Sequence, residues 1–487
     1  MTEKPIHWKV FTAVAVGIFM ATLDSSIVNV CLPSIGNDFG IDIAVAQWVS
    51  LSYLITVAAL ILPAGRFADL IGRSRAYMAG LVLFTAGSLV CGVAPTAGAL
   101  IGSRALQALG ASLIMATGAA LLTDAWPAEK RGHAMGLVGM TVSVGLMTGP
   151  ALGGILSDRL DWRWIFYVNL PIGILGTLLA IRALRGVGGR GGKLASFDIP
   201  GALSLGGFMT ALSLGLTFGQ VHGWRYPWTV GLTAVAPLLL GFFIWRQTTA
   251  DEPMLQLKLF LNRTFTSAAA AALISFAGQF PVLLLLPFYL QGVLGYSEMS
   301  TGLTILVLPA VTAVFAPLSG KLSDRIGTRW PTTVAMAIRA GCYVLLLRLG
   351  PHSSHWDVII PLAVLALGSA AFGPANNSAI MGAVPPANRG IAGSMASAMR
   401  SLGMVIGAAV GTAIAAAKAG GVGGGSKVAV LDALERPEAF IEGFHAAIVF
   451  SICCAVLAGV AAVARPNDAG IMTKLMGGAT AQNAEVL

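Results

Sequence analysis

Residues 65–75 read GRFADLIGRSR, and residues 320–330 read GKLSDRIGTRW. Four residues coincide in the two copies, in the pairs Gly65/Gly320, Asp69/Asp324, Ile71/Ile326 and Gly72/Gly327. Each copy also follows the second apolar segment of its own set. Because the residues and their place in the chain both coincide, the repeat predicts a protein made of two related halves, a common plan among membrane proteins.

The composition restricts the class of protein. Of 487 residues, 56% are hydrophobic and 10% are charged, with a mean hydropathy of +0.81. Soluble domains carry about 25% charged residues, so the chain is predicted to be an all-α polytopic membrane protein. A spanning helix needs about twenty apolar residues. Fourteen such segments lie near 11–32, 46–64, 77–95, 98–123, 134–157, 164–182, 198–219, 228–246, 264–290, 301–319, 331–349, 357–382, 390–417 and 443–464.

Lysine and arginine set the predicted orientation. With both termini in the cytoplasm, the cytoplasmic loops and tails hold twenty of these residues and the outer loops hold seven. This is the bias expected of loops that stay inside, and it explains the net charge of +9 without nucleic-acid binding. The predicted parts are a cytoplasmic N-terminus (1–10), a six-helix bundle (11–182), two additional helices with linkers (183–263), a second six-helix bundle (264–464) and a cytoplasmic tail (465–487).

The repeated segment is expected to form a tight cytoplasmic turn flanked by glycines. Asp69 could cap a neighbouring helix or pair with Arg73 or Arg75, and such a charge cluster could latch one half to the other. The alternative is ordinary positive charge on a cytoplasmic loop. The candidate gating residues are Gly65, Arg66, Asp69, Gly72, Arg73, Arg75, Asp324 and Arg325.

A carboxylate interrupts the first apolar segment, FMATLDSSIVNVCLP at residues 19–33. An ionised aspartate at the bilayer centre costs about 3 kcal/mol on insertion scales, so such residues usually face a cavity and mark function. On a helix Asp24 shares a face with Ile27 and Val28. A carboxylate in a water-poor cavity is suited to bind and release a proton, which makes Asp24 the candidate proton carrier. The alternative is an aspartate bonded to backbone near a helix end.

Other polar and helix-breaking residues also lie within predicted spans. Pro150 should kink the fifth segment, while nearby glycines allow a partner helix to approach closely; ordinary small-residue packing is the alternative. The residues of this candidate kink are Gly145, Gly149, Pro150, Gly153 and Gly154. Candidate cavity-lining residues, each of which could instead join two helices, are Asn29, Tyr53, Gln107, Gln279, Tyr289, Asn376, Asn377 and Arg400. Arg339 has no predicted partner.

Several motifs carry a family resemblance. GRFADLIGRSR resembles the loop signature of the major facilitator superfamily. FMATLDSSIVNVCLP, IGSRALQALGAS (101–112) and GLMTGPALGG (145–154) resemble the first-, fourth- and fifth-helix motifs of its fourteen-helix drug/proton antiporter branch. WRWIFYVNLPIG (162–173) and DEPMLQLKLF (251–260) are also similar to that branch. Leu70 and Ala108 depart from the patterns, where a basic residue and a glycine are usual.

The resemblance implies the major facilitator fold, with two six-helix bundles and two extra central helices. It also implies a proton-coupled antiporter that exports drugs, and a role for Arg104 in proton coupling beside Asp24. In physical terms, a nearby cation favours the ionised form of a carboxylate and can displace its proton. A purely structural Arg104, bonded to backbone carbonyls, is the alternative.

Missing motifs exclude other classes. The sequence has no P-loop, no metal-ligand spacing and no Ser/His/Asp arrangement, so we expect no enzyme, no cofactor and no metal, with the proton gradient as the energy source. The five cysteines (Cys31, Cys91, Cys342, Cys453 and Cys454) are expected to be buried hydrophobes.

The expected partners are the bilayer, protons and an amphipathic small molecule that is neutral, zwitterionic or singly charged. The protein is expected to act as a monomer in a bacterial inner membrane. A dedicated exporter of one metabolite or self-made antibiotic, and a non-transporting membrane sensor, remain alternatives.

Overall fold

The computed structural model describes residues 6–126, 131–184, 198–250, 253, 257–384, 389–423 and 436–466, and all regular elements in these ranges are helical. This confirms the predicted all-α class. The chain divides into two compact units. The first unit comprises Met1–Met254, Leu283–Leu306 and Ala408–Gly443, and the second comprises Leu255–Val282, Val307–Gly407 and Phe444–Leu487.

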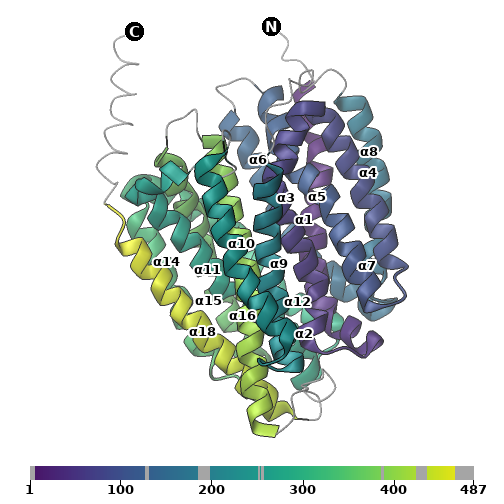
Figure 1. Cartoon of the computed structure of the whole chain (residues 1–487), viewed down its shortest axis with the longest axis vertical. Coiled ribbons are helices and arrows are strands. Elements are labelled where there is room, and N and C mark those ends of the chain that lie inside the picture. The colour runs from purple at the N-terminus through teal and green to yellow at the C-terminus, as the bar shows by residue number, and fades with distance from the viewer. Residues whose placement is uncertain are drawn as a thin grey trace. The chain divides into compact units, whose positions relative to one another are not determined.

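The helices of the described ranges are labelled in Figure 1. The first unit holds α1 (Ile6–Phe39), α2 (Ile43–Ala46), α3 (Trp48–Ile71), α4 (Arg73–Gly92), α5 (Ala97–Ala125), α6 (Arg131–Arg159), α7 (Trp164–Tyr167), α8 (Asn169–Ala183), α9 (Ile199–His222), α10 (Pro227–Thr249), the π-helical turn η3 (Tyr289–Val293) and α12 (Glu298–Ile305). The second unit holds the 3-10 turn η2 (Leu257–Leu261), α13 (Val307–Ile326), α14 (Arg329–Leu346) and α15 (His355–Gly382). Three helices contribute residues to both units: α11 (Arg263–Phe288), α16 (Arg389–Gly423) and α18 (Pro437–Val463).

Twelve helical segments among the described residues are long and apolar enough to cross a membrane. They account for twelve of the fourteen predicted spans. The other two predicted spans coincide with α3, whose apolar stretch Trp48–Ile61 is shorter, and with α14, which carries Arg329 and Arg339. The count of fourteen therefore stays a prediction.

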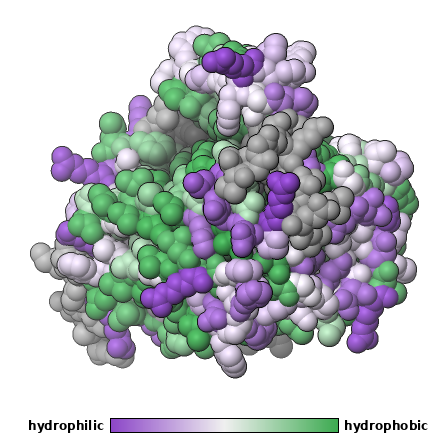
Figure 2. Space-filling model, turned by 90° about the horizontal axis from the view of Figure 1, so that it is seen from below, coloured by the Kyte–Doolittle hydropathy of each residue, from purple (hydrophilic) through white to green (hydrophobic). Residues whose placement is uncertain are grey.

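Apolar side chains cover much of the outside of the helices. On α10, for example, Leu238 is 71% exposed and Trp245 is 57% exposed. Figure 2 shows wide areas of apolar residues on the face seen from below. Exposed apolar area of this extent is unfavourable in water but suits contact with lipid, which agrees with a multi-pass membrane protein.

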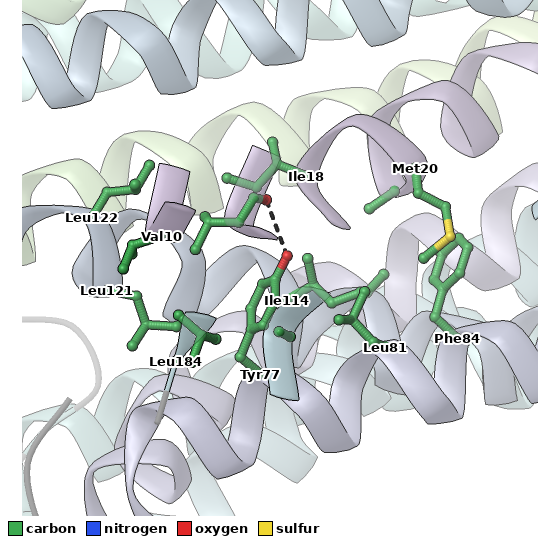
Figure 3. Close-up of a cluster of buried hydrophobic side chains, with 14 of the residues drawn as sticks. Val10, Ile18, Met20, Tyr77, Leu81, Phe84, Ile114, Leu121, Leu122 and Leu184 are labelled. Carbon is green, nitrogen blue, oxygen red and sulfur yellow. Dashed lines mark hydrogen bonds between the residues drawn. The ribbon is translucent and has the colours of Figure 1, made fainter. Parts of the chain in front are cut away.

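The core of the first unit packs around Tyr77 of α4, as Figure 3 shows. The Tyr77 hydroxyl donates to the carbonyl oxygens of Ala13 and Val14 on α1, each at 3.0 Å. A side chain at Gly17 would collide with the Tyr77 ring and hydroxyl, so glycine allows α1 and α4 to approach there. A buried phenol needs such a partner, and this contact holds α1 beside α4.

The repeated sequence segment forms a different structure from the predicted loop. Residues from Gly65 to Ile71 are the last turns of α3, and Gly72 alone separates α3 from α4. Gly72 has φ +95° and Gly327 has φ +83°, both in the region that favours glycine. The expectation of a loop over the whole segment was wrong, because a single glycine with positive φ suffices to end one helix and start the next.

Helices α4 and α5 pack with their backbones in near contact. A side chain at Gly110 of α5 would meet the backbone of Phe84 and Gly80 on α4, and one at Gly87 of α4 would meet Gln107 on α5. Glycine at these positions lets the two helices approach more closely than any side chain would allow. As a result, polar residues of α4 and α5 meet in the interior of the first unit.

Candidate functional site

Asp24 lies at the centre of a buried polar network in the first unit. Its side chain is fully buried on α1. Oδ1 accepts hydrogen bonds from Gln107 Nε2 at 2.9 Å and from Asn169 Nδ2 at 2.8 Å, and Oδ2 forms an ion pair with Arg104 Nη1. Asp24 is thus bound by side chains from α5 and α8 rather than by the backbone of its own helix. The contact with Arg104, which the sequence alone did not establish, is present in the structure.

Arg104 is held on several sides. It is 1% exposed, and its Nε donates to the carbonyl oxygen of Val49 on α3 at 3.0 Å. Its guanidinium lies 4.4 Å from the centre of the Tyr53 ring, a cation–π distance. The Tyr53 hydroxyl donates to the Ala21 carbonyl at 3.2 Å. Tyr53 therefore supports both α1 and the arginine.

Asn169 and Ser88 complete the network, and sequence analysis did not select either. Gln107 Nε2 donates to Ser88 Oγ at 2.6 Å, and Asn169 Nδ2 lies 3.3 Å from the same oxygen. The Oδ1 atom of Asn169 is buried and has no hydrogen-bond partner among the described residues. The available signal was that Asn169 stands in WRWIFYVNLPIG, one of the family-like motifs, within an apolar segment.

The network compensates the charge of one buried carboxylate. Paired with Arg104, the ionised Asp24 is compensated, and two amides satisfy its other oxygen. Breaking a buried pair by removing one partner costs about 3–5 kcal/mol.

The glycines of the predicted kink pack α6 against the part of α1 that carries Asp24. Side chains at Gly145, Gly149 and Gly153 would collide with Thr22, Ser26 and Ile27 of α1, respectively. Gly154 instead abuts the backbone of Glu298 on α12, and Gly302 of α12 abuts Pro150. α6 thus has one glycine face against α1 and a second close contact with α12.

The second unit has its own buried polar centre, around Arg339 of α14. Arg339 Nη2 donates to the Ser275 carbonyl at 2.9 Å, to Tyr343 Oη at 3.0 Å and to Gln279 Oε1 at 3.4 Å. Nη1 donates to Ser275 Oγ. No carboxylate among the described residues pairs with this guanidinium. Arg339, for which no partner could be predicted, is thus bonded to neutral groups of α11 and α14.

The other candidate cavity residues are dispersed. Asn29 accepts from Ser50 at 2.9 Å. Asn376 bridges Arg465 Nη2 (2.8 Å) and the Ala268 carbonyl (3.0 Å), so it joins helices in this structure. The remaining three are Tyr289, buried in η3; Asn377, exposed on α15; and Arg400, half-buried on α16 and 3.3 Å from Ser397.

The predicted gating residues are only partly described. Arg75 and Arg325 are exposed and Arg73 is half-buried. The side chains of Arg66, Asp69 and Asp324 lie outside the described part of the structure, so the latch stays a prediction.

Four of the five cysteines are buried, as expected, but Cys453 is exposed on α18. That expectation failed because an apolar residue of a membrane helix can face lipid as well as the core.

Comparisons with known proteins bear on this geometry. The sequence profile described as Major Facilitator Superfamily matches residues 14–198, 199–408 and 270–472. The chain is 35% identical over 397 residues to the riboflavin transporter RibZ of Clostridioides difficile, covering 81% of this chain and 85% of the relative. It is also 35% identical over 392 residues to the multidrug resistance protein Stp of Mycobacterium tuberculosis, covering 80% and 72%.

Solved structures agree with the helical architecture. The crystal structure of a bacterial homolog of the human lysosomal transporter Spinster, in an inward-facing and unoccupied conformation, matches with a TM-score of 0.67. The match covers 95% of this chain and 98% of the other at 18% identity. At that level of identity the likeness supports the fold alone.

Proposed function

The chain belongs to the Major Facilitator Superfamily and is a transporter rather than an enzyme; from this premise we propose that it is a proton-coupled antiporter that exports amphipathic drugs, antibiotics or other toxic small molecules. The observation that carries the proposal is the fully buried Asp24–Arg104 ion pair on α1 and α5. Buried ionisable pairs in membrane helices mark ion pathways more often than stability.

The proposed cycle uses one titratable group. When substrate binding and helix movement separate Arg104 from Asp24, the carboxylate takes up a proton from the outside. When Arg104 returns, it stabilises the ionised form and the proton leaves to the cytoplasm. A proton moving inward is driven by about 2.3 kcal/mol per 100 mV of membrane potential. Gln107 and Asn169 keep the carboxylate in place in both states.

The proposed substrate is amphipathic and carries at most one positive charge. Asp24 is compensated by Arg104, whereas Arg339 on α14 and Arg400 on α16 form no ion pair among the described residues. A substrate with several cations would be repelled by this balance.

A dedicated exporter of one metabolite is the second candidate. The similarity to a riboflavin transporter favours it. The chain is 35% identical to that transporter and also 35% identical to a multidrug resistance protein. The breadth of resistance on expression would separate the two: several unrelated compounds for the first, one for the second. A non-transporting sensor would move neither.

Several further features are proposed with this function. The chain would span the inner membrane fourteen times with both termini in the cytoplasm, act as a monomer and need no cofactor. The two bundles (11–182 and 264–464) would alternate access to the substrate, with 183–263 as an addition. The charged residues around Gly72 and Gly327 would form the cytoplasmic latch, and the glycines of α6 would allow α6 to move against α1.

The test is dye accumulation in inside-out vesicles with an acidic lumen. The wild type should accumulate dye, and Asp24→Asn should not accumulate it above the level of vesicles that lack the protein. Asp198→Asn is the matched control, because Asp198 is also buried and pairs with Arg246 at 2.8 Å, but caps α9 away from the network. Undiminished accumulation by Asp24→Asn would refute the proposal.

A further inference from the structure

A second acidic residue lies half-buried against α1. Glu298 is the first residue of α12, and its Oε1 accepts a hydrogen bond from Ser34 Oγ on α1. Its Oε2 is buried and has no hydrogen-bond partner among the described residues. No cation of the described residues pairs with it. Sequence analysis did not consider Glu298, because it stands at the margin of a predicted span.

The backbone around Glu298 is tightly packed. A side chain at Gly154 of α6 would collide with the carbonyl oxygen of Glu298, and one at Gly302 would collide with the carbonyl oxygen of Pro150. The first turn of α12 therefore rests directly on α6. The carboxyl group lies against α1, where Ser34 donates to it.

In the described part of the structure, the titratable groups near Glu298 supply no cation to it; Asp38, one turn after Ser34 on α1, pairs with Arg163 instead. Cys31 of α1 lies within electrostatic range, and it is a buried thiol. The neighbouring η3 contributes Tyr289, a buried phenol. On α6, Asp158 and Arg159 are exposed, and no ion pair among the described residues joins Glu298 to either.

Two opposing effects act on the carboxyl group. The first turn of a helix stabilises a negative charge by about 0.3–1 kcal/mol, and the Ser34 hydroxyl also donates to it. Burial of Oε2 without a cation or donor penalises the ionised form. Opening of the contact between α12 and α1 would expose Oε2 to water and remove this penalty.

We propose that Glu298 is a second proton-binding residue of the transport cycle, which takes up a proton when α12 closes against α1 and releases it when they part. The inference rests on the proposed function, in which α1 runs outward and Ser34 lies near its outer end, about 15 Å beyond Asp24 along the helix. Closing of α12 against the outer end of α1 would then require a proton from the outside. Asp24 is proposed to take its proton from the same compartment.

The Glu298 proton returns to the outside when the contact opens again. It therefore adds nothing to the number of protons that cross per cycle. Its role is to control the contact between α12 and the outer end of α1. Low external pH favours closing of this contact while Asp24 is protonated, and high external pH keeps the contact open.

Cys31 provides a native reporter for this movement, because it is buried one turn before Ser34 on α1. Right-side-out vesicles with their gradients collapsed are treated with a membrane-impermeant maleimide, and modification of Cys31 is followed by mass spectrometry. The labelling rate of the wild type is divided by that of Glu298→Gln at each pH, which cancels the titration of the thiol and of Asp24. Glu438→Gln, an exposed acid on the first turn of α18, is the control.

The ratio should rise about tenfold between about pH 5.5 and about pH 8 if the open and closed forms differ tenfold in proton affinity. A ratio that does not change with pH overturns the inference. Glu438→Gln should follow the wild type. If Glu298→Gln fails to fold, Glu298→Ala serves instead, because it also lacks a titratable group at this position. The wild-type labelling rate divided by the Glu298→Ala rate should again rise with pH, and a flat ratio would overturn the inference.

Dye accumulation by the wild type in parallel vesicles separates the two hypotheses. Accumulation together with a flat ratio refutes the role of Glu298 alone, whereas no accumulation refutes the proposed function.

Discussion

The Asp24 centre of the first unit and the Arg339 centre of the second unit are both buried and polar but differ in charge. The spacing that relates Gly65 to Gly320 places Gln279 at the repeat position of Asp24. In the first unit a guanidinium meets a carboxylate, and in the second it meets the amide of Gln279 at 3.4 Å. One repeat position thus carries a group that can exchange a proton, and its counterpart carries one that cannot.

The two arginines come from different places in the repeat. The repeat position of Arg339 is Phe84, a core residue of α4, whereas Arg104 stands on α5. The two centres thus share one polar repeat position, while their arginines stand at positions that the repeat does not relate. The first centre therefore holds a buried ion pair, whereas the second joins helices through neutral hydrogen bonds.

Removal of each arginine should give the largest difference in stability between the two centres. Arg104→Ala leaves Asp24 buried without its cation, and we expect the free energy of unfolding in micelles to fall by about 3–5 kcal/mol. Arg339→Ala leaves only neutral groups unpaired and should cost about 1–3 kcal/mol. The double variant Asp24→Asn/Arg104→Ala should recover part of the first loss. Equal losses for the two single variants would mean that the charge of Asp24 does not distinguish the centres.

A smaller loss of stability is expected from disturbing the contact between α4 and α5 beside the Asp24 centre. Gly87→Ala places a methyl group against the backbone of Gln107, so α4 and α5 must separate. Overpacking of this kind costs about 1–3 kcal/mol, and transport should fall because Gln107 leaves Asp24. Gly98→Ala is the control, since nothing lies within 4 Å of a methyl group there. The measurement is thermal unfolding together with dye accumulation; a fully active Gly87→Ala would contradict the close contact.

Gln279→Glu should make the second centre resemble the first. A carboxylate beside Arg339 replaces a neutral hydrogen bond by a charge-assisted one, and we expect a gain of about 1 kcal/mol in the free energy of unfolding. Gln279→Leu, which keeps the bulk but loses the acceptor, should be destabilised. Destabilisation by Gln279→Glu as well would show that Arg339 is already compensated by its neutral partners.

Much of the fold could be predicted from the sequence. The apolar segments predicted the helices. The repeat predicted that Gly72 and Gly327 are equivalent, and each ends one helix with a positive φ. What the pattern could not show is that Gly65–Ile71 continues α3 as helix. The residues from Gly65 to Ile71 are compatible with either a loop or a helix, so the sequence alone does not decide between the two.

The candidate site could be predicted only in part. Asp24, Arg104 and Gln107 were chosen as polar residues in apolar segments, and they meet in the structure. Asn169 and Ser88 were not chosen, because hydrogen bonds between helices depend on which faces pack together, and periodicity on one helix does not specify its neighbour. For the same reason Asn376, an equally good candidate by pattern, joins helices of the second unit instead.

The most direct test of the account is proton movement driven by substrate in sealed proteoliposomes. An outward substrate gradient should acidify the lumen of liposomes containing the wild type, because each exported molecule is exchanged for a proton that enters. Asp24→Asn should produce no change in lumenal pH, although exchange of labelled for unlabelled substrate without a gradient should persist. Acidification by Asp24→Asn equal to that of the wild type would contradict the central claim that Asp24 carries the coupled proton.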